Sequence, residues 1–264
     1  MGDKGGDNHS EVTDFILVGI RVRPERHSLL FLLFLIIYGM VLLGNLSMIG
    51  IIVIDPRLNA PMYFFLGSLS VIGLSYSTGI VPKAMVNILS QKKTISFAGC
   101  VAQLFLYALF MVTEAFVLAA MAYDSFIAIC NPLLYSVRMS RSVCIQLVAG
   151  SYLCGWVSSI LQISVTFSMS FCASRVIDHF YCDSNPIEKI SCSNVFMNRW
   201  CQLVWPSSLF FCSITPPNNP EPRKVASVCY ILFTPMLNPL IYSLRNKDVK
   251  DAMKKVLWKK KILL

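Results

Sequence analysis

The chain has 264 residues, of which 55% are hydrophobic and only 14% are charged, and its formal net charge is +9. Because a soluble domain carries about a quarter charged residues, this composition and a mean hydropathy of +0.62 predict a membrane protein with several helical spans. Nucleic-acid binding is excluded, because the basic residues cluster at loop ends and in the tail, where they fit anchoring beside anionic lipid.

Residues 1–27 form a polar leader without the apolar core of a cleavable signal peptide. Asn8 begins a glycosylation sequon, which is usable if this end of the chain is translocated. The first span, residues 29–54, contains no charged residue. Asn45 lies inside it and needs a partner from another helix or a bound water, so we interpret it as a contact between helices rather than with a ligand.

A tight turn at residues 55–57 leads to the second span, residues 62–81, which we expect to stop at Pro82. The residues on one side of this span have small side chains, which suit close helix packing. They are Gly67, Ser68, Ser70, Gly73, Ser75 and Ser77. Residues 83–96 form a basic and polar connection that can begin as helix. The third segment, residues 97–129, is longer than one bilayer crossing and is expected to tilt or protrude.

Glu114 lies in the middle of the third segment. A carboxylate at membrane depth is costly and by default marks a function. The alternative is a protonated glutamic acid that bonds a neighbouring helix, and the sequence leaves both open. Asp124 lies ten residues further along, about 15 Å by helical rise, which is too far for the two acids to share a water as an aspartyl protease would. No enzyme, cofactor or metal is predicted.

A short loop, residues 131–142, precedes the fourth span, residues 143–169. A polar loop, residues 171–194, then carries three cysteines at a spacing of ten, Cys172, Cys182 and Cys192, and Cys100 begins the third segment at the same membrane face. Four cysteines on one face allow three pairings. His179 and Cys182 also resemble a metal pair, but two ligands are too few for a structural zinc site.

The last part of the chain breaks the regular pattern. Residues 195–214 are a poor span, residues 215–224 a proline-rich turn, and residues 225–242 a final span. The basic tail belongs in the cytoplasm; its apolar residues recur at helical spacing, which indicates an amphipathic helix on the inner leaflet. The cysteine loop is expected to lie outside. If residues 195–214 crossed the membrane from there, the final span would run outward and leave the basic tail outside. We therefore infer that one to two helices are missing.

Several motifs together resemble vertebrate olfactory receptors, a group of rhodopsin-like G-protein-coupled receptors. These motifs are Gly44-Asn45, Pro61-Met62-Tyr63-Phe64-Phe65-Leu66, Met121-Ala122-Tyr123-Asp124 with Ile127-Ala128-Ile129-Cys130-Asn131-Pro132-Leu133, the loop cysteines, and Pro235-Met236-Leu237-Asn238-Pro239-Leu240-Ile241-Tyr242-Ser243-Leu244-Arg245-Asn246. The resemblance implies one all-α seven-helix domain over residues 1–264 in the plasma membrane. Residues 1–27 would be extracellular, residues 28–242 the membrane bundle, and residues 243–264 the cytoplasmic tail.

The resemblance also implies a function and its residues. Small volatile odorants would activate a stimulatory G protein and adenylate cyclase. Disulfides would join Cys100 to Cys182 and Cys172 to Cys192. The odorant pocket, below the tethered loop, would be apolar; its wall on the third helix would include Tyr107, Ala108, Met111 and Val112, for which ordinary helix packing is the alternative. Coupling and switching would involve Asp124, Ser125, Asn238, Pro239 and Tyr242.

The chain departs from the family pattern in three places. Ser125 stands where the family has the arginine of Asp-Arg-Tyr, and it can neither restrain the inactive state nor meet the G protein as arginine does. Gly73 replaces an acid that would act jointly with Glu114. The missing stretch corresponds to most of helices five and six. A second hypothesis is therefore a truncated, non-signalling protein that stays in the endoplasmic reticulum or acts by pairing with other receptors.

Overall fold

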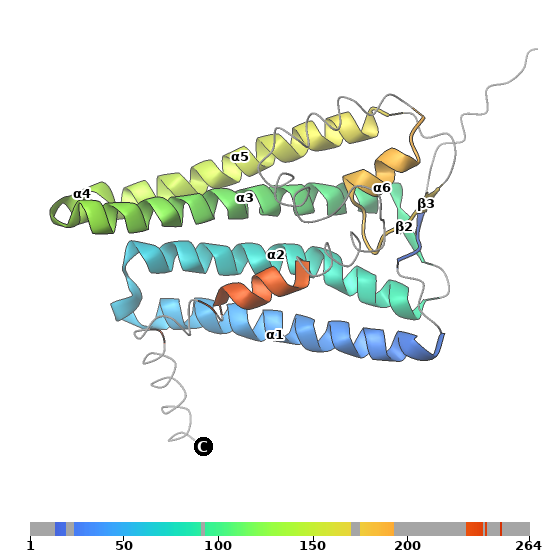
Figure 1. Cartoon of the computed structure of the whole chain (residues 1–264), viewed down its shortest axis with the longest axis horizontal. Helices are drawn as coiled ribbons and strands as arrows, with labels where there is room; N and C mark the ends of the chain where they lie inside the picture. Colours follow the sequence, from blue (N-terminus) through green and yellow to red (C-terminus); the bar gives the residue numbers. More distant parts are fainter. Residues whose placement is uncertain are drawn as a thin grey trace, which may run out of the picture.

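The computed structural model of the protein describes residues 14–19, 24–90, 93–169, 175–192 and 231–239, with Ile241 and Val249. In these residues four helices are long and apolar enough to cross a membrane. They are α1 (His27–Ile54), α2 (Pro61–Leu89), α3 (Phe97–Cys130) and α5 (Arg141–Phe167). At 1.5 Å per residue each is about 40–50 Å long, so each can cross a hydrocarbon core of about 30 Å. α1 packs on α2, α2 on α3, and α3 on α5 (Figure 1).

The predicted spans agree closely with these helices except at one proline. α2 was expected to stop at Pro82, but the helix runs through Pro82 to Leu89. Proline lacks an N–H and disturbs the helix before it. Here Val81 and Ala84, on either side of it, are buried in the core while Pro82 itself is exposed. Tertiary packing therefore keeps the helix continuous against the local preference.

Side chains cap the element that follows two of the connections between the helices. Asp55 accepts a hydrogen bond from the backbone N–H of Arg57 at 3.1 Å and begins the 3-10 turn η2 (Pro56–Leu58), which confirms the predicted tight turn. Ser96 caps α3 by accepting from the N–H of Gly99 at 3.2 Å. The turn η1 (Pro24–Arg26) precedes α1, and η3 (Pro132–Leu134) with the short helix α4 (Tyr135–Arg138) joins α3 to α5.

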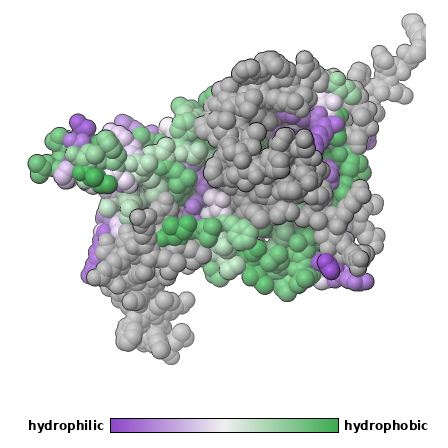
Figure 2. Space-filling model, viewed as in Figure 1, coloured by the Kyte–Doolittle hydropathy of each residue, from purple (hydrophilic) through white to green (hydrophobic). Residues whose placement is uncertain are grey.

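The outer surface of the helices is apolar. On α1, leucine side chains such as Leu32, Leu33 and Leu43 are exposed, while Phe34, Val41 and other apolar residues are buried. Figure 2 shows large apolar areas on the surface of the molecule. A helix that is apolar on all sides is buried in protein or in lipid. The exposed side of α1 is therefore a lipid-facing surface.

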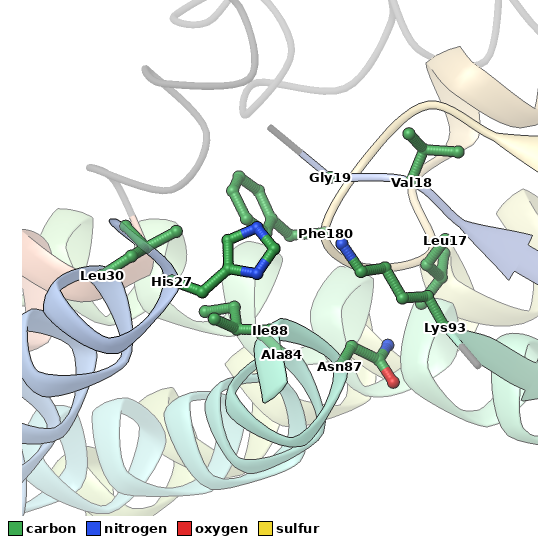
Figure 3. Close-up of a pocket in the computed structure, with 10 residues that line it drawn as sticks. All are labelled: Leu17, Val18, Gly19, His27, Leu30, Ala84, Asn87, Ile88, Lys93 and Phe180. Carbon is green, nitrogen blue, oxygen red and sulfur yellow. The ribbon is translucent and has the colours of Figure 1, made fainter. Parts of the chain in front are cut away.

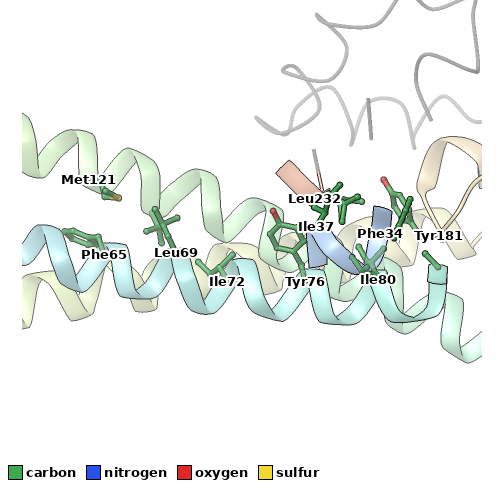
Figure 4. Close-up of a cluster of buried hydrophobic side chains, with 14 of the residues drawn as sticks. Phe34, Ile37, Phe65, Leu69, Ile72, Tyr76, Ile80, Met121, Tyr181 and Leu232 are labelled. Atoms are coloured by element: carbon green, nitrogen blue, oxygen red, sulfur yellow. The ribbon is translucent and has the colours of Figure 1, made fainter. Parts of the chain in front are cut away.

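The main core lies along α2. Its buried side chains Phe65, Leu69, Ile72, Tyr76 and Ile80 recur every three or four residues, so they lie on one face of the helix (Figure 4). The same cluster includes, among others, Met121 of α3, Phe34 and Ile37 of α1, Tyr181 of the cysteine loop, and Leu232. α2 is thus the central helix of the described part of the bundle.

A small sheet at the end of the bundle that carries the cysteine loop was not predicted. Strand β1 (Asp14–Leu17) pairs antiparallel with β2 (Thr94–Ser96) and parallel with β3 (Val176–Ile177). Phe15 and Leu17 are buried beneath it and the alternate side chains are exposed. Part of the expected polar leader is therefore a strand that pairs with both β2 and β3. The cysteine loop also contains a short helix, α6 (Ser184–Lys189).

Several sequence predictions concern residues that the structure does not describe. The poor span at 195–214, the proline-rich turn at 215–224, Asn8, Cys172 and Tyr242 lie outside the described residues. The final span is described at residues 231–239, which are helical. In the tail, Val249 is helical and fully buried against Met48, Leu58 and other residues of the α1–α2 end. This residue therefore contacts the bundle, and the amphipathic helix on the inner leaflet stays a prediction.

Candidate functional site

The cysteine loop is fixed to the top of α3 by a disulfide and a side-chain amide. Cys100 and Cys182 are joined by a disulfide, as the resemblance implied, and both are fully buried. One turn further along α3, Gln103 accepts a hydrogen bond from the N–H of Cys182 at 3.0 Å and donates to the carbonyl of Gly79 at 3.3 Å. Gln103, which the sequence analysis missed, therefore ties the loop to both α3 and α2.

The same loop takes part in a second disulfide. Cys192 is disulfide-bonded, and its predicted partner Cys172 lies outside the described residues. The Cys172–Cys192 pairing therefore stays a prediction.

Aromatic side chains of the loop reach down into the bundle. Tyr181 is almost fully buried, and its ring centroid lies 5.5 Å from that of Tyr107 on α3. Phe180 lies 5.9 Å from Phe34 of α1 by the same measure. Such distances are within the range of favourable aromatic pairs. The loop thus forms an apolar lid over the space between the helices.

Beneath this lid is a closed inner pocket, lined by Tyr76, Tyr107, Met111 and Glu114, in which no space for a water molecule remains between the side chains. It contains two of the four residues predicted to contact odorant, Tyr107 and Met111. The other two do not line it, since Val112 is buried in packing and Ala108 is only partly buried. Ligand sites usually offer about 300 Å³ or more, so a ligand can enter this pocket only if its side chains move apart.

Glu114 has a partner on the last helix. The side-chain amide of Asn238 donates to Glu114 Oε1 at 2.9 Å, and Glu114 is 2% exposed. Gly73 leaves Glu114 without the acid that the family pattern pairs with it, and Asn238 supplies a different partner. The geometry favours the interpretation in which Glu114 bonds a neighbouring helix.

The same helix is held by α1 and α2. The Asn45 amide donates to the carbonyl of Pro235 at 2.9 Å, which confirms the predicted contact between helices. A Cβ added at Gly73 would lie 2.9 Å from Pro235 Cβ, and one at Gly44 would lie 3.3 Å from Pro239 Cγ. Both glycines therefore let residues 231–239 approach closely.

Asp124 forms a second polar centre at the other end of α3. It is 4% exposed and accepts a hydrogen bond from the Tyr135 hydroxyl at 2.9 Å. Burial, together with the contact with Asp124, raises the pKa of the Tyr135 phenol, so the phenol stays protonated and remains the donor at neutral pH. Sequence reasoning missed Tyr135, because nothing in the pattern links two residues on either side of a turn.

Ser125 does not take part in this centre. It is exposed, and its hydroxyl donates to the carbonyl of Met121 in its own helix at 3.0 Å. Asn238 bonds Glu114, and Pro239 packs on Gly44. The structure therefore does not gather the predicted switch residues into one cluster within its described part.

Replacing Tyr135 with phenylalanine is expected to destabilise this end of the bundle. The change removes the hydrogen-bond donor to a buried carboxylate and leaves the ring, and such a loss costs about 1–2 kcal/mol. Thermal unfolding of the purified protein in nanodiscs, followed by labelling of the buried thiol of Cys144 after accessible thiols are blocked, would show a lower midpoint. Tyr123→Phe is the control, since Tyr123 is exposed; equal midpoints for the two variants would contradict the prediction.

Comparison with known proteins identifies the family. The sequence model of a family described as Olfactory receptor matches residues 34–215. Olfactory receptor 9K2 of Homo sapiens is 56% identical over 313 aligned positions, which cover 100% of this chain and 93% of that protein. Olfactory receptor 5I1 of Homo sapiens is 42% identical, with 95% and 96% covered, and Olfactory receptor 5M5 of Mus musculus is 41% identical, with 94% of each covered.

The length of this alignment also bears on the predicted loss of one to two helices. The 313 aligned positions exceed the 264 residues of this chain by 49, and two crossings of about 20 residues with a loop account for that number. Rhodopsin-like olfactory receptors are multi-pass plasma-membrane receptors that couple to G proteins and are not enzymes, and the four membrane-length helices of the described residues fit that architecture. The chain belongs to the olfactory receptor family.

Proposed function

We propose that this chain binds small volatile odorants in the inner pocket and couples their binding to a heterotrimeric G protein of the stimulatory olfactory type. The observation that carries the proposal is the loop held over that pocket by the Cys100–Cys182 disulfide. Its aromatic lid and the side chains of Tyr107 and Met111 offer an apolar surface. Apolar ligands are bound by burial in such a pocket.

The proposed orientation puts residues 1–27 outside, with Asn8 available for glycosylation, residues 28–242 in the membrane, and residues 243–264 in the cytoplasm. The described charges support it: Arg138 and Arg141 lie at the end where α3 meets α5, and basic residues favour the cytoplasmic side. The lipid-facing surface of α1 supports membrane lipid as a second partner.

The G protein would meet the end of α3 that carries Asp124. Ile129, Leu133 and Val137 are 79%, 96% and 73% exposed around the turn there. Large apolar side chains exposed beyond a span favour contact with another protein.

A truncated protein without signalling activity is the second candidate. It is favoured by Ser125, whose hydroxyl bonds its own helix and carries no charge to a partner, and by the 49 positions without counterpart. Such a protein would be retained in the endoplasmic reticulum or act by pairing with other receptors.

Surface staining combined with a cAMP reporter and a broad panel of apolar odorants would separate the two candidates. Surface display with a response supports the receptor; retention without a response supports the truncated protein. In a responsive line, Met111→Trp should raise the half-maximal odorant concentration by about tenfold, because the larger indole occupies the space into which the odorant must move the pocket side chains. Leu118→Trp on the exposed side of α3 is the matched control, and equal effects of the two variants would refute this pocket.

A further inference from the structure

The lid over the inner pocket, residues 175–181 of the cysteine loop, is attached at both of its ends. At one end Cys182 is bonded to Cys100, and its N–H donates to Gln103. At the other end the lid contains β3, which pairs in parallel with β1 (Figure 1). The first attachment includes a covalent bond, whereas the second consists of hydrogen bonds and packing, which can open and close locally.

Backbone hydrogen bonds join β1 and the two residues after it to the lid. The N–H groups donate to lid carbonyls from Ile16 to Arg175 at 2.8 Å, from Val18 to Ile177 at 3.0 Å, and from Gly19 to His179 at 3.2 Å. Gly19 has a φ of 62°, and a Cβ there would lie 3.1 Å from the ring of Phe180, which lies beside it in Figure 3. Glycine at this position therefore lets the chain close against the lid.

β1 is attached more extensively to the bundle than to the lid. It pairs with β2 at three positions and with β3 at two, and β2 leads directly into α3. The Phe15 ring is stacked on that of Phe97, the first residue of α3, with centroids 6.0 Å apart. Phe15 and Leu17 are buried in one cluster with Leu104 of α3. The shorter pairing with β3 is therefore the one that separates first.

The closed lid keeps the inner pocket shut. Tyr181 of the lid packs on Tyr107, which lines the pocket, with ring centroids 5.5 Å apart. No space for a water molecule remains inside, so a ligand enters only when these side chains move apart. Lifting the lid takes Tyr181 away from Tyr107. Ile177 of the lid is fully buried in the cluster that contains Leu17, so the closed position is the stable one.

We propose that β1 is a latch for the inner pocket. β3 separates from β1 while β1 stays paired with β2, the lid lifts about its disulfide at Cys182, and a small molecule reaches the pocket. The proposal rests on the proposed function in taking this pocket as the odorant site. Lids of this kind open on the microsecond to millisecond timescale. Access to Met111 in the pocket should therefore depend on the β1–β3 pairing and not on the β1–β2 pairing.

Two cross-links that share one position test the latch. Ile16 is the register partner of Val176 in β3 and of Thr94 in β2. All three side chains are exposed, and paired residues of neighbouring strands lie about 5 Å apart, which a disulfide can span. Ile16→Cys/Val176→Cys locks the lid to β1, and Ile16→Cys/Thr94→Cys is the matched control. Each pair is combined with Met111→Cys in the full chain in phosphatidylcholine nanodiscs.

The measurement is the rate at which methanethiosulfonate-ethylammonium labels the thiol at position 111, read by mass spectrometry, which also confirms each cross-link. Ile16→Cys/Val176→Cys should slow labelling about tenfold or more relative to Met111→Cys alone, because the open population is removed. Reduction and desalting before labelling should restore the rate. Ile16→Cys/Thr94→Cys should label as Met111→Cys does. An unchanged rate in the first cross-link, equal slowing in both, or no labelling of Met111→Cys itself would overturn the proposal.

A variant without a cross-link probes the opposite direction. Gly19→Ala strains the backbone and pushes against Phe180, so labelling should become several-fold faster, whereas Gly39→Ala, with nothing within 4 Å, should not change it. If a cross-linked chain does not fold, this comparison decides, and equal rates would overturn the latch. Labelling needs no odorant. A chain that never signals can therefore still confirm the latch, and a latch without effect leaves the proposed function standing.

Discussion

Gly155→Ala is expected to break the packing of α3 against α5. A Cβ at Gly155 would overlap Thr113 Oγ1 and lie 2.7 Å from the carbonyl oxygen of Leu109. Thr113 is fully buried and its hydroxyl donates to that same carbonyl at 2.7 Å. The added methyl would therefore enter a hydrogen bond between a buried side chain and a backbone that cannot move without bending α3.

The expected loss is about 3 kcal/mol, at the upper end for overpacking in a tight core. Small residues allow membrane helices to approach closely, and no hydrophobic force between the helices offsets their separation in lipid. The measurement is the unfolding midpoint in nanodiscs, read from labelling of the buried Cys144 thiol.

Gly150→Ala is the matched control on the same helix. Nothing lies within 4 Å of a Cβ at that position, and alanine is the better helix former by about 1 kcal/mol. Its midpoint should stay equal or rise. If Gly155→Ala behaved like Gly150→Ala, α3 and α5 could not approach as closely as described.

The helices were predictable because length and hydropathy are properties of each segment alone. The close approaches were not, because they depend on which faces meet. The small residues of α2 indicated close packing, and Gly73 is indeed in close contact with Pro235. Gly155, which makes the closest approach among the described glycines, was not singled out, since the sequence of α5 shows no reason to prefer it over Gly150.

The sheet escaped prediction for a related reason. β1 has only four residues, and its partners lie near residues 95 and 176, so the pairing is stabilised by contacts far apart in sequence. The Cys100–Cys182 bond was anticipated through the resemblance, because disulfide cysteines form a recognisable spacing. The bonds of Gln103 and Tyr135 leave no such pattern. Side-chain hydrogen bonds between distant segments become visible only once the helices are placed.

Restoring the acid that the family usually carries in α2, by Gly73→Asp, is expected to destabilise this chain. The new Cβ would lie 2.9 Å from Pro235 Cβ and 3.6 Å from Asn45 Oδ1. That oxygen is a buried acceptor with no hydrogen-bond partner among the described residues, so a carboxylate beside it adds a second acceptor and no donor. The steric contact and the uncompensated charge together cost about 3–5 kcal/mol.

The loss should appear where the last helix is attached. Moving Pro235 away from α2 breaks the bond from Asn45 to its carbonyl and, further along, the bond from Asn238 to Glu114. Gly73→Ala separates the steric part from the charge, and Gly39→Ala, at a site with nothing within 4 Å, controls for the helix effect. The unfolding midpoint should be highest for Gly39→Ala, lower for Gly73→Ala and lowest for Gly73→Asp. A Gly73→Asp midpoint raised by sodium but not by choline would show instead that the new acid and Glu114 hold a cation together, and that the last helix can move to admit it.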